Sequence, residues 1–189
     1  MDLSTIITVV VALVIVGAIL AWSFIPRQRT KKLREQFGPE YDYLVNEAEN
    51  QQEAETELVE RQERVKSFDI HPLSPHACER FSEAWQVTQA HFVDKPAEAV
   101  EEADRLVSEV MQARGYPMAN FEQRAADVSV DHPTVVTHYR AAHEIALENE
   151  QGEANTEDLR QAMVHYRALF EDLLEVRESN NNHKETIPS

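Results

Sequence analysis

SPHACERFSEAWQVTQAHF, residues 74–92, is the stretch from which the fold is most directly deduced. Ser74 followed by Pro75 is a helix start signal, because Ser caps free amide groups and Pro suits the first helical position. Beyond it, mostly apolar side chains recur at alternating spacings of three and four residues, which places them on one face of a helix. They are Cys78, Phe81, Trp85, Thr88 and Phe92. The pattern predicts an amphipathic helix that buries this face.

Three further stretches downstream show the same spacing. The first runs from Pro96 to the expected stop signal Gly115, and the second follows Asp131, the expected cap, with Pro133 in its first turn. The third begins at Thr156, after a polar loop. The predicted inward-facing residues are Val100, Ala103, Leu106, Val107, Val110, Met111, Val135, Val136, Tyr139, Ala142, Ala146, Leu159, Met163, Tyr166, Phe170, Leu173 and Leu174.

Four principal helices joined by short connections over about 105 residues predict a compact antiparallel bundle, so the expected fold class is all-α. We place this acidic bundle at residues 68–176, with a short additional helix over 121–128. A domain of this length can bury a self-sufficient core. Residues 177–189 are polar and are expected to form a disordered tail.

Upstream of the bundle, residues 27–67 comprise a basic juxtamembrane stretch and a polar helical stretch. Gly38-Pro39 is expected to break the first helix, because Pro disfavours a helical residue before it. Residues 40–66, EYDYLVNEAENQQEAETELVERQERVK, are rich in helix formers, but their apolar positions are too sparse for a coiled coil. One long exposed helix is therefore expected, about 40 Å in length if unbroken.

The N-terminal segment, residues 1–26, has a different character. From Ile6 to Ile25 the chain reads IITVVVALVIVGAILAWSFI, without a charged residue. As a helix this run is about 30 Å long, which matches the hydrocarbon core of a bilayer, so it predicts a transmembrane helix. The alternative is a cleaved signal peptide, which is typically shorter in its apolar run and preceded by basic residues. Here no Lys or Arg precedes the run.

The charge pattern predicts the orientation and the partners. Five basic residues follow within RQRTKKLR, residues 27–34, so the N-terminus is expected outside and the C-terminal domain in the cytoplasm, anchored in the inner (plasma) membrane. This flank either determines topology alone or also attracts anionic lipids. Residues 1–35 carry five basic and two acidic side chains, a net charge of +3. Because the whole chain has a net charge of −16, the remaining residues carry −19. Such a body repels phosphate backbones, which argues against a nucleic-acid partner.

Contacts with the bilayer are expected through residues 6–25. Within that run, Gly17 and Ala21 form a small-xxx-small pair, which predicts at most a weak homodimer.

The sequence lacks recognisable catalytic equipment. The single cysteine, Cys78, excludes an intramolecular disulfide and a Cys-rich zinc site, and it lies on the expected apolar face. His138 and His143 are five residues apart and so occupy different faces of a helix. A di-iron bundle requires a glutamate three residues before the histidine, but the residue three positions before His165 is Ala162. With no nucleophile elbow or phosphate-binding glycine loop, we predict no catalytic residue, no cofactor and no metal.

Residues 114–143 are the most promising place for a partner. The stretch contains Tyr116, Phe121, Arg124 and Arg140 within a predominantly acidic body, and aromatic and Arg residues are common anchors of protein interfaces. These four are the candidate partner-binding residues. The alternative is that the aromatic rings are core and that the arginines pair locally with acidic neighbours.

The runs GYPMANFEQRAADVSVDHPTVVTHYRAAHEIA (residues 115–146) and KKLREQFGPEYD (residues 31–42) resemble a family of uncharacterised bacterial single-span membrane proteins with a helical cytoplasmic domain. The resemblance covers most of the chain and implies a bacterial origin. It implies no activity and no cofactor.

Taken together, these features favour a membrane-tethered helical module that binds or positions another protein, with the partner's identity unknown. The alternative is an unfamiliar membrane-anchored enzyme that uses His and carboxylates in a bundle cleft. A third hypothesis is a self-associating spacer built on residues 40–66. An exposed apolar patch would favour the first hypothesis, and a concave pocket with His and carboxylates would favour the second.

Overall fold

The computed structural model describes residues 28–181, with side chains as far as Leu174. All regular structure in this range is helical, which confirms the predicted all-α class. The predicted membrane anchor, residues 6–25, lies outside the described range. Among the described helices, none is sufficiently long and apolar to cross a bilayer. The chain divides into two compact units, and the division falls inside one helix, between Leu58 and Val59.

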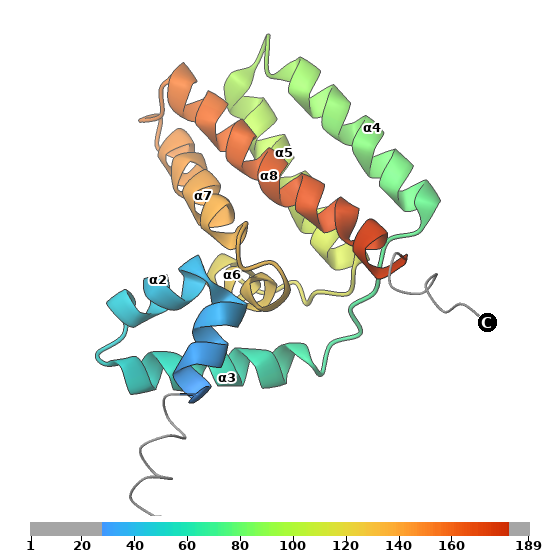
Figure 1. Cartoon of the computed structure of the whole chain (residues 1–189). Coiled ribbons are helices and arrows are strands. Elements are labelled where there is room, and N and C mark those ends of the chain that lie inside the picture. Colours follow the sequence, from blue (N-terminus) through green and yellow to red (C-terminus); the bar gives the residue numbers. More distant parts are fainter. Residues whose placement is uncertain (1–27, 182–189) are drawn as a thin grey trace, which may run out of the picture. The chain divides into compact units, whose positions relative to one another are not determined.

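The C-terminal unit contains a helical bundle. Its principal helices are α4 (Pro75–His91), α5 (Pro96–Ala113), α7 (Val136–Glu150) and α8 (Thr156–Asn181), with the shorter α6 (Phe121–Asp131) between α5 and α7. Figure 1 shows α8 alongside α7 and α5, with α4 packed on α5. The pairs α4–α5 and α7–α8 are joined by short connections and lie side by side, so each pair runs antiparallel, as predicted.

The core of the bundle is formed by the predicted helix faces. Every residue expected to face inward is buried or partly buried, and Trp85 stacks on Phe170 with ring centroids 4.8 Å apart. The start of α4 is also as expected, because the Ser74 hydroxyl accepts a hydrogen bond from the Ala77 amide at 3.2 Å. Burial of this apolar face is the main source of bundle stability, at roughly 25 cal/mol per Å².

Two boundaries of the bundle differ from the prediction. Asp131 does not cap α7: it is the last residue of α6, and its carboxylate accepts the Tyr116 hydroxyl. The His132 carbonyl instead accepts the amides of Val135 and Val136, and this turn delays the start of α7. At the other boundary, α8 continues to Asn181, past residue 177 where composition predicted a disordered tail. Residues 182–189 lie outside the described range.

The prediction of one long exposed helix over residues 40–66 is wrong, because the N-terminal unit has two separate helices in this range. Residues 28–37 are helical, and Gly38, at φ 48°, separates them from α2 (Pro39–Glu47), as the Gly-Pro pair predicts. A second break then separates α2 from α3 (Gln51–Val65). Ala48 is extended, and the Asn50 side chain accepts the Glu53 amide at 3.0 Å. Asn50 followed three residues later by Glu is a helix start signal that the sequence analysis missed.

The two helices are not fully exposed either, because a buried carboxylate lies in this unit. Glu55 accepts hydrogen bonds from the Thr30 hydroxyl at 2.7 Å, the Gln51 amide at 2.8 Å and the Tyr41 hydroxyl at 3.0 Å. Burial alone would raise the pKa of the Glu55 carboxyl, but these three donors outweigh it and lower the pKa. Glu55 therefore serves as a polar centre of the unit.

Candidate functional site

The four predicted partner-binding residues lie in different surroundings. Tyr116 is in the core, with 3% of its surface exposed, and its hydroxyl donates to Asp131 at 2.9 Å. Phe121, at the start of α6, is partly buried against the bundle. Arg124 and Arg140 are both half-buried, on α6 and α7. The structure therefore does not gather the four into one exposed patch, and partner binding by this region stays a prediction.

Arg124 belongs to a polar cluster where α6 packs on α7. Its Nε donates to the Tyr139 hydroxyl at 3.1 Å, and its Nη1 donates to the Ala119 carbonyl at 3.0 Å. Nearby, the Tyr166 hydroxyl of α8 donates to the Asp104 carboxylate of α5 at 2.9 Å. Burial, followed by the charge of Asp104, raises the pKa of Tyr166 well above its ordinary value. Burial also raises the pKa of Tyr139, against the opposing charge of Arg124. Both phenols are thus held protonated, as hydrogen-bonding groups.

His143 lies on the same side of the bundle. Its ring stacks on Phe121 with centroids 3.6 Å apart and an interplanar angle of 12°, and Phe121 also contacts Tyr139. Burial lowers the pKa of the His143 imidazole, with the charge of Asp104 opposing the shift. Its Nδ1 atom is buried and has no hydrogen-bond partner among the described residues. Within this cluster, the neutral His143 imidazole with an unused nitrogen is the group best suited to accept or donate a proton.

A second cluster surrounds Arg114, at the end of α5. The guanidinium is 4% exposed, and its Nη1 donates to the Leu173 carbonyl and to His132 Nε2, both at 3.1 Å. Because Nε2 accepts this bond, the proton of the neutral imidazole must be on Nδ1, which contacts the Asp172 carboxylate. Arg114, His132 and Asp172 therefore form a chain of polar groups that ties α5, α6 and α8 together.

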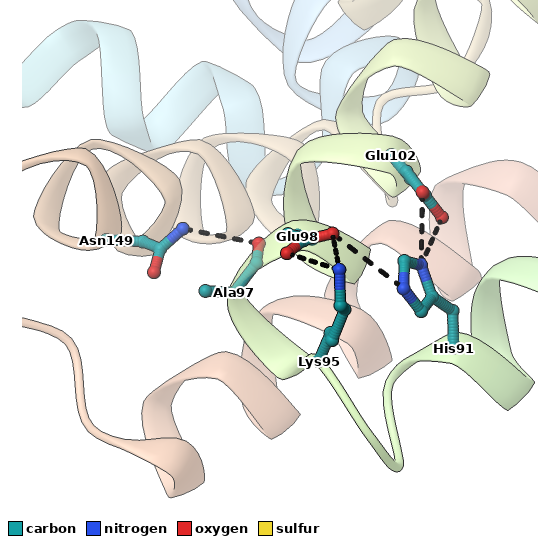
Figure 2. A network of polar contacts seen from close by, with 6 residues as sticks. All are labelled: His91, Lys95, Ala97, Glu98, Glu102 and Asn149. Atoms are coloured by element: carbon teal, nitrogen blue, oxygen red, sulfur yellow. Dashed lines mark hydrogen bonds and ion pairs between the residues drawn. The ribbon is translucent and has the colours of Figure 1, made fainter.

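A third arrangement joins α4 to α5 (Figure 2). His91 Nδ1 is 3.1 Å from both Glu102 oxygens, and its Nε2 is 3.9 Å from the Glu98 carboxylate. Lys95 approaches the same Glu98 carboxylate at 2.8 Å. Lys95 and Glu98 are exposed to solvent, whereas His91 and Glu102 are half-buried. Exposed pairs of this kind contribute little to stability, typically below about 1 kcal/mol.

The fourth arrangement is a pair of histidines on different helices. His138 of α7 and His165 of α8 lie with their Nδ1 atoms 2.9 Å apart and their ring centroids 5.1 Å apart. Burial, and then the neighbouring His138, lowers the pKa of His165. The sequence does not predict this pair, because spacing along the chain relates each histidine only to residues of its own helix. The register between two helices, which the sequence spacing does not contain, brings them together.

Groups with metal-ligand chemistry are otherwise dispersed. Among the described residues, no group of three or more His, Cys, Asp or Glu side chains is arranged to hold a metal ion. Cys78 is half-buried on α4, within the packed face that the sequence predicts.

Comparison with known protein families, with curated proteins and with solved structures finds no match for this chain. The resemblance to a bacterial single-span membrane family therefore stays a prediction.

Proposed function

We propose that this chain is a membrane-tethered helical module that binds or positions another protein at the inner membrane. The anchor would be residues 6–25, and the helical body would face the cytoplasm. The basic residues 27–34 support this orientation, because Lys and Arg are retained on the cytoplasmic side. The specific partner is left open.

One observation carries the proposal: the polar groups inside the bundle are largely occupied by one another. Arg124 is held by Tyr139 and a backbone carbonyl, and Asp104 is held by Tyr166. Arg114 is held by His132 and the Leu173 carbonyl. Groups so engaged stabilise helix packing, and they are not available for substrate chemistry without first breaking those bonds. Function is therefore sought on the surface.

The connector between α5 and α6 is the part of the predicted region with exposed apolar surface. Met118 is 46% exposed there, next to the exposed residues Pro117 and Asn120. Methionine is a frequent contact residue at adaptable binding surfaces, because its side chain is flexible and polarisable. The net charge of −19 on residues 36–189 favours a partner whose docking face is basic.

Capture of the full-length protein from native membranes, followed by mass spectrometry, tests the proposal. Met118→Asp should remove a specific co-purifying protein and leave the melting temperature nearly unchanged, because the side chain is exposed. Val93→Asp is the matched control, since Val93 is an exposed apolar residue in the α4–α5 turn. Loss of the partner in both variants, or in neither, would contradict a binding surface at the connector.

The orientation is tested separately. Alkaline phosphatase or a fluorescent protein is fused after Ser189, and the proposal expects an inactive phosphatase and a fluorescent reporter. Active phosphatase with a dark fluorescent fusion would place the body outside the cytoplasm.

The second candidate function is a membrane-anchored enzyme, and His143 is the observation that favours it. A neutral histidine with an unused buried nitrogen can accept a proton during catalysis. His143→Gln distinguishes the two functions. If the protein is an enzyme, this variant should still fold and still capture its partner but should no longer support the cellular phenotype. If the protein is a binding module, the variant should keep both the phenotype and the capture.

A further inference from the structure

Two imidazole rings meet at the interface of α7 and α8. Their Nδ1 atoms are 2.9 Å apart, and the rings are inclined by only 28°. Both histidines are half-buried, so the pair is accessible from solvent on one side. We propose that His138 and His165 together bind a divalent transition-metal ion, as two imidazole ligands from neighbouring helices with water completing the coordination.

The helix core fixes the positions of both ligands. His138 precedes Tyr139 in the sequence, and His165 precedes Tyr166, and both tyrosines are fully buried. Because α7 and α8 pack against each other, the backbone positions of the two histidines are fixed by this core. The ligands are thus held together before any ion arrives, which lowers the entropic cost of binding.

The protonation chemistry of the pair favours an ion between the two rings. A hydrogen bond between two Nδ1 atoms needs one N–H donor and one lone pair, so the pair holds a single shared proton there. If both Nδ1 atoms were protonated, two N–H groups would point at each other. A metal ion in place of the proton can accept lone pairs from both nitrogens at once, provided both rings are deprotonated at Nδ1.

The separation of the nitrogens indicates which ions fit. With metal–nitrogen distances of about 2.0–2.1 Å, two ligands at a right angle are about 2.9 Å apart, and two at a tetrahedral angle about 3.4 Å. The observed 2.9 Å therefore matches adjacent positions of the tetragonal or octahedral arrangements that Cu²⁺ and Ni²⁺ prefer. Zn²⁺ would require the rings to move apart by about 0.5 Å.

The electrostatic surroundings also suit a cation. The neighbours one turn away on the two helices are uncharged; they are Thr134, Val135, Ala141, Ala142, Gln161, Ala162, Ala168 and Leu169. Arg167, farther around α8, is paired with Glu171 at 2.6 Å. The net charge of −16 draws cations towards the protein as a whole.

The test uses the full-length protein in detergent, purified without a polyhistidine tag and stripped with a chelator. Adding NiCl₂ should raise the melting temperature by on the order of 5 °C at a concentration about 100 times Kd, because the ion binds only the folded pair. Elemental analysis after equilibrium dialysis should give one nickel per chain. His138→Gln and His165→Gln should each abolish both effects.

Two control variants locate the binding. His76→Gln removes an exposed histidine of α4, and His91→Gln removes the histidine that faces Glu98 and Glu102. Both should retain the nickel-dependent shift. Loss of the shift in His91→Gln alone would move the site to the α4–α5 network and overturn the proposal. Binding that survives in every single variant would be nonspecific and would also overturn it.

A spectroscopic measurement keeps the test decisive if the glutamine variants fail to fold. Electron paramagnetic resonance of the wild-type protein with one equivalent of Cu²⁺ should show coupling to two imidazole nitrogens. A spectrum with one nitrogen, or with oxygen ligands alone, would contradict the site, as would the absence of any nickel-dependent thermal shift in the wild type.

Discussion

The two ends of the bundle are held together by different kinds of contact (Figure 1). At one end, the closed end, residues 69–71 lie against residues 114–115. Arg114 also contacts His132 and Leu173, and Tyr116 contacts Asp131. At the opposite end, called the open end, lie the α4–α5 turn and the α7–α8 loop. Both ends reverse the chain between packed helices, so they invite direct comparison.

The closed end relies on buried polar groups and close backbone contact. The His71 amide donates to the Arg114 carbonyl at 2.9 Å, and the Arg114 side chain reaches the Leu173 carbonyl. Gly115, at φ 95°, lies against the backbone of Asp69. A side chain at position 115 would have to enter space that the backbone of Asp69 already occupies.

The open end relies instead on polar side chains that are exposed or half-buried. His91, Lys95, Glu98 and Glu102 interact near the surface (Figure 2), and the Asn149 amide reaches the Ala97 carbonyl at 3.3 Å. The contacts at the two ends of the bundle therefore contribute very different free energies to stability. A buried polar group that loses its partner costs folding free energy, whereas an exposed one forms hydrogen bonds to water instead. We therefore expect equivalent substitutions to be costly at the closed end and mild at the open end.

The largest difference is expected between two glycines. A Cβ on Gly115 would be 2.2 Å from the Asp69 carbonyl oxygen, whereas a Cβ on Gly152, at φ 75°, would meet nothing within 4 Å. Gly152→Ala should cost about 1–2 kcal/mol, from backbone strain alone. Gly115→Ala adds the clash to this strain and should cost at least about 3 kcal/mol. Hydrogen exchange of bundle amides in the full-length protein measures both costs. Equal costs would show that the Asp69 backbone moves aside freely.

Arg114 and Lys95 provide the next contrast. Arg114→Met leaves the Leu173 carbonyl and His132 Nε2 without their buried donor, and it should destabilise the bundle by roughly 2–4 kcal/mol. Lys95→Met removes an exposed pair with Glu98 and should be close to neutral. Both changes keep an unbranched side chain, so packing is matched. The same hydrogen-exchange experiment applies, and a neutral Arg114 variant would mean that water replaces the guanidinium.

A single hydroxyl provides a finer measure of the closed end. Burial and Asp131 raise the pKa of Tyr116 well above its ordinary value, so the phenol remains a donor across the physiological range. Tyr116→Phe removes only the hydrogen bond to Asp131 and should cost about 0.5–1.5 kcal/mol. The same hydrogen-exchange experiment measures this cost. An unchanged stability in Tyr116→Phe would mean that the Tyr116–Asp131 bond contributes no net stability.

Much of the bundle could be predicted because burial imposes periodicity on each helix. The stripe containing Phe81 and Trp85 specifies its helix face, and Gly115 is identified as a stop signal by residue type alone. The break before α3 was missed because helix-forming residues surround it. Its signal, Asn50 with Glu53 three residues later, is present in the sequence but is outweighed by composition.

The candidate sites were largely unpredictable for a different reason. Their members come from different helices, and only the packed register brings them together. The sequence cannot show that His138 faces His165, or that Arg124 reaches Tyr139, because these residues are far apart along the chain. Composition marks residues 114–143 as unusual, but it does not show that Tyr116 is buried.

The smallest effect is expected within the network of the open end. His91→Gln removes an imidazole that lies 3.1 Å from the Glu102 carboxylate, with both side chains 29% exposed. We expect a loss of about 0.5–1 kcal/mol at low salt, and less at high salt, because ions screen exposed charges. A double-mutant cycle with Glu102→Gln isolates the interaction from the other effects of each substitution. A salt-sensitive coupling below about 1 kcal/mol would agree with the proposed difference between the two ends. A salt-insensitive coupling above about 2 kcal/mol would mean that the open end, like the closed end, depends on a desolvated polar contact, and the comparison would fail.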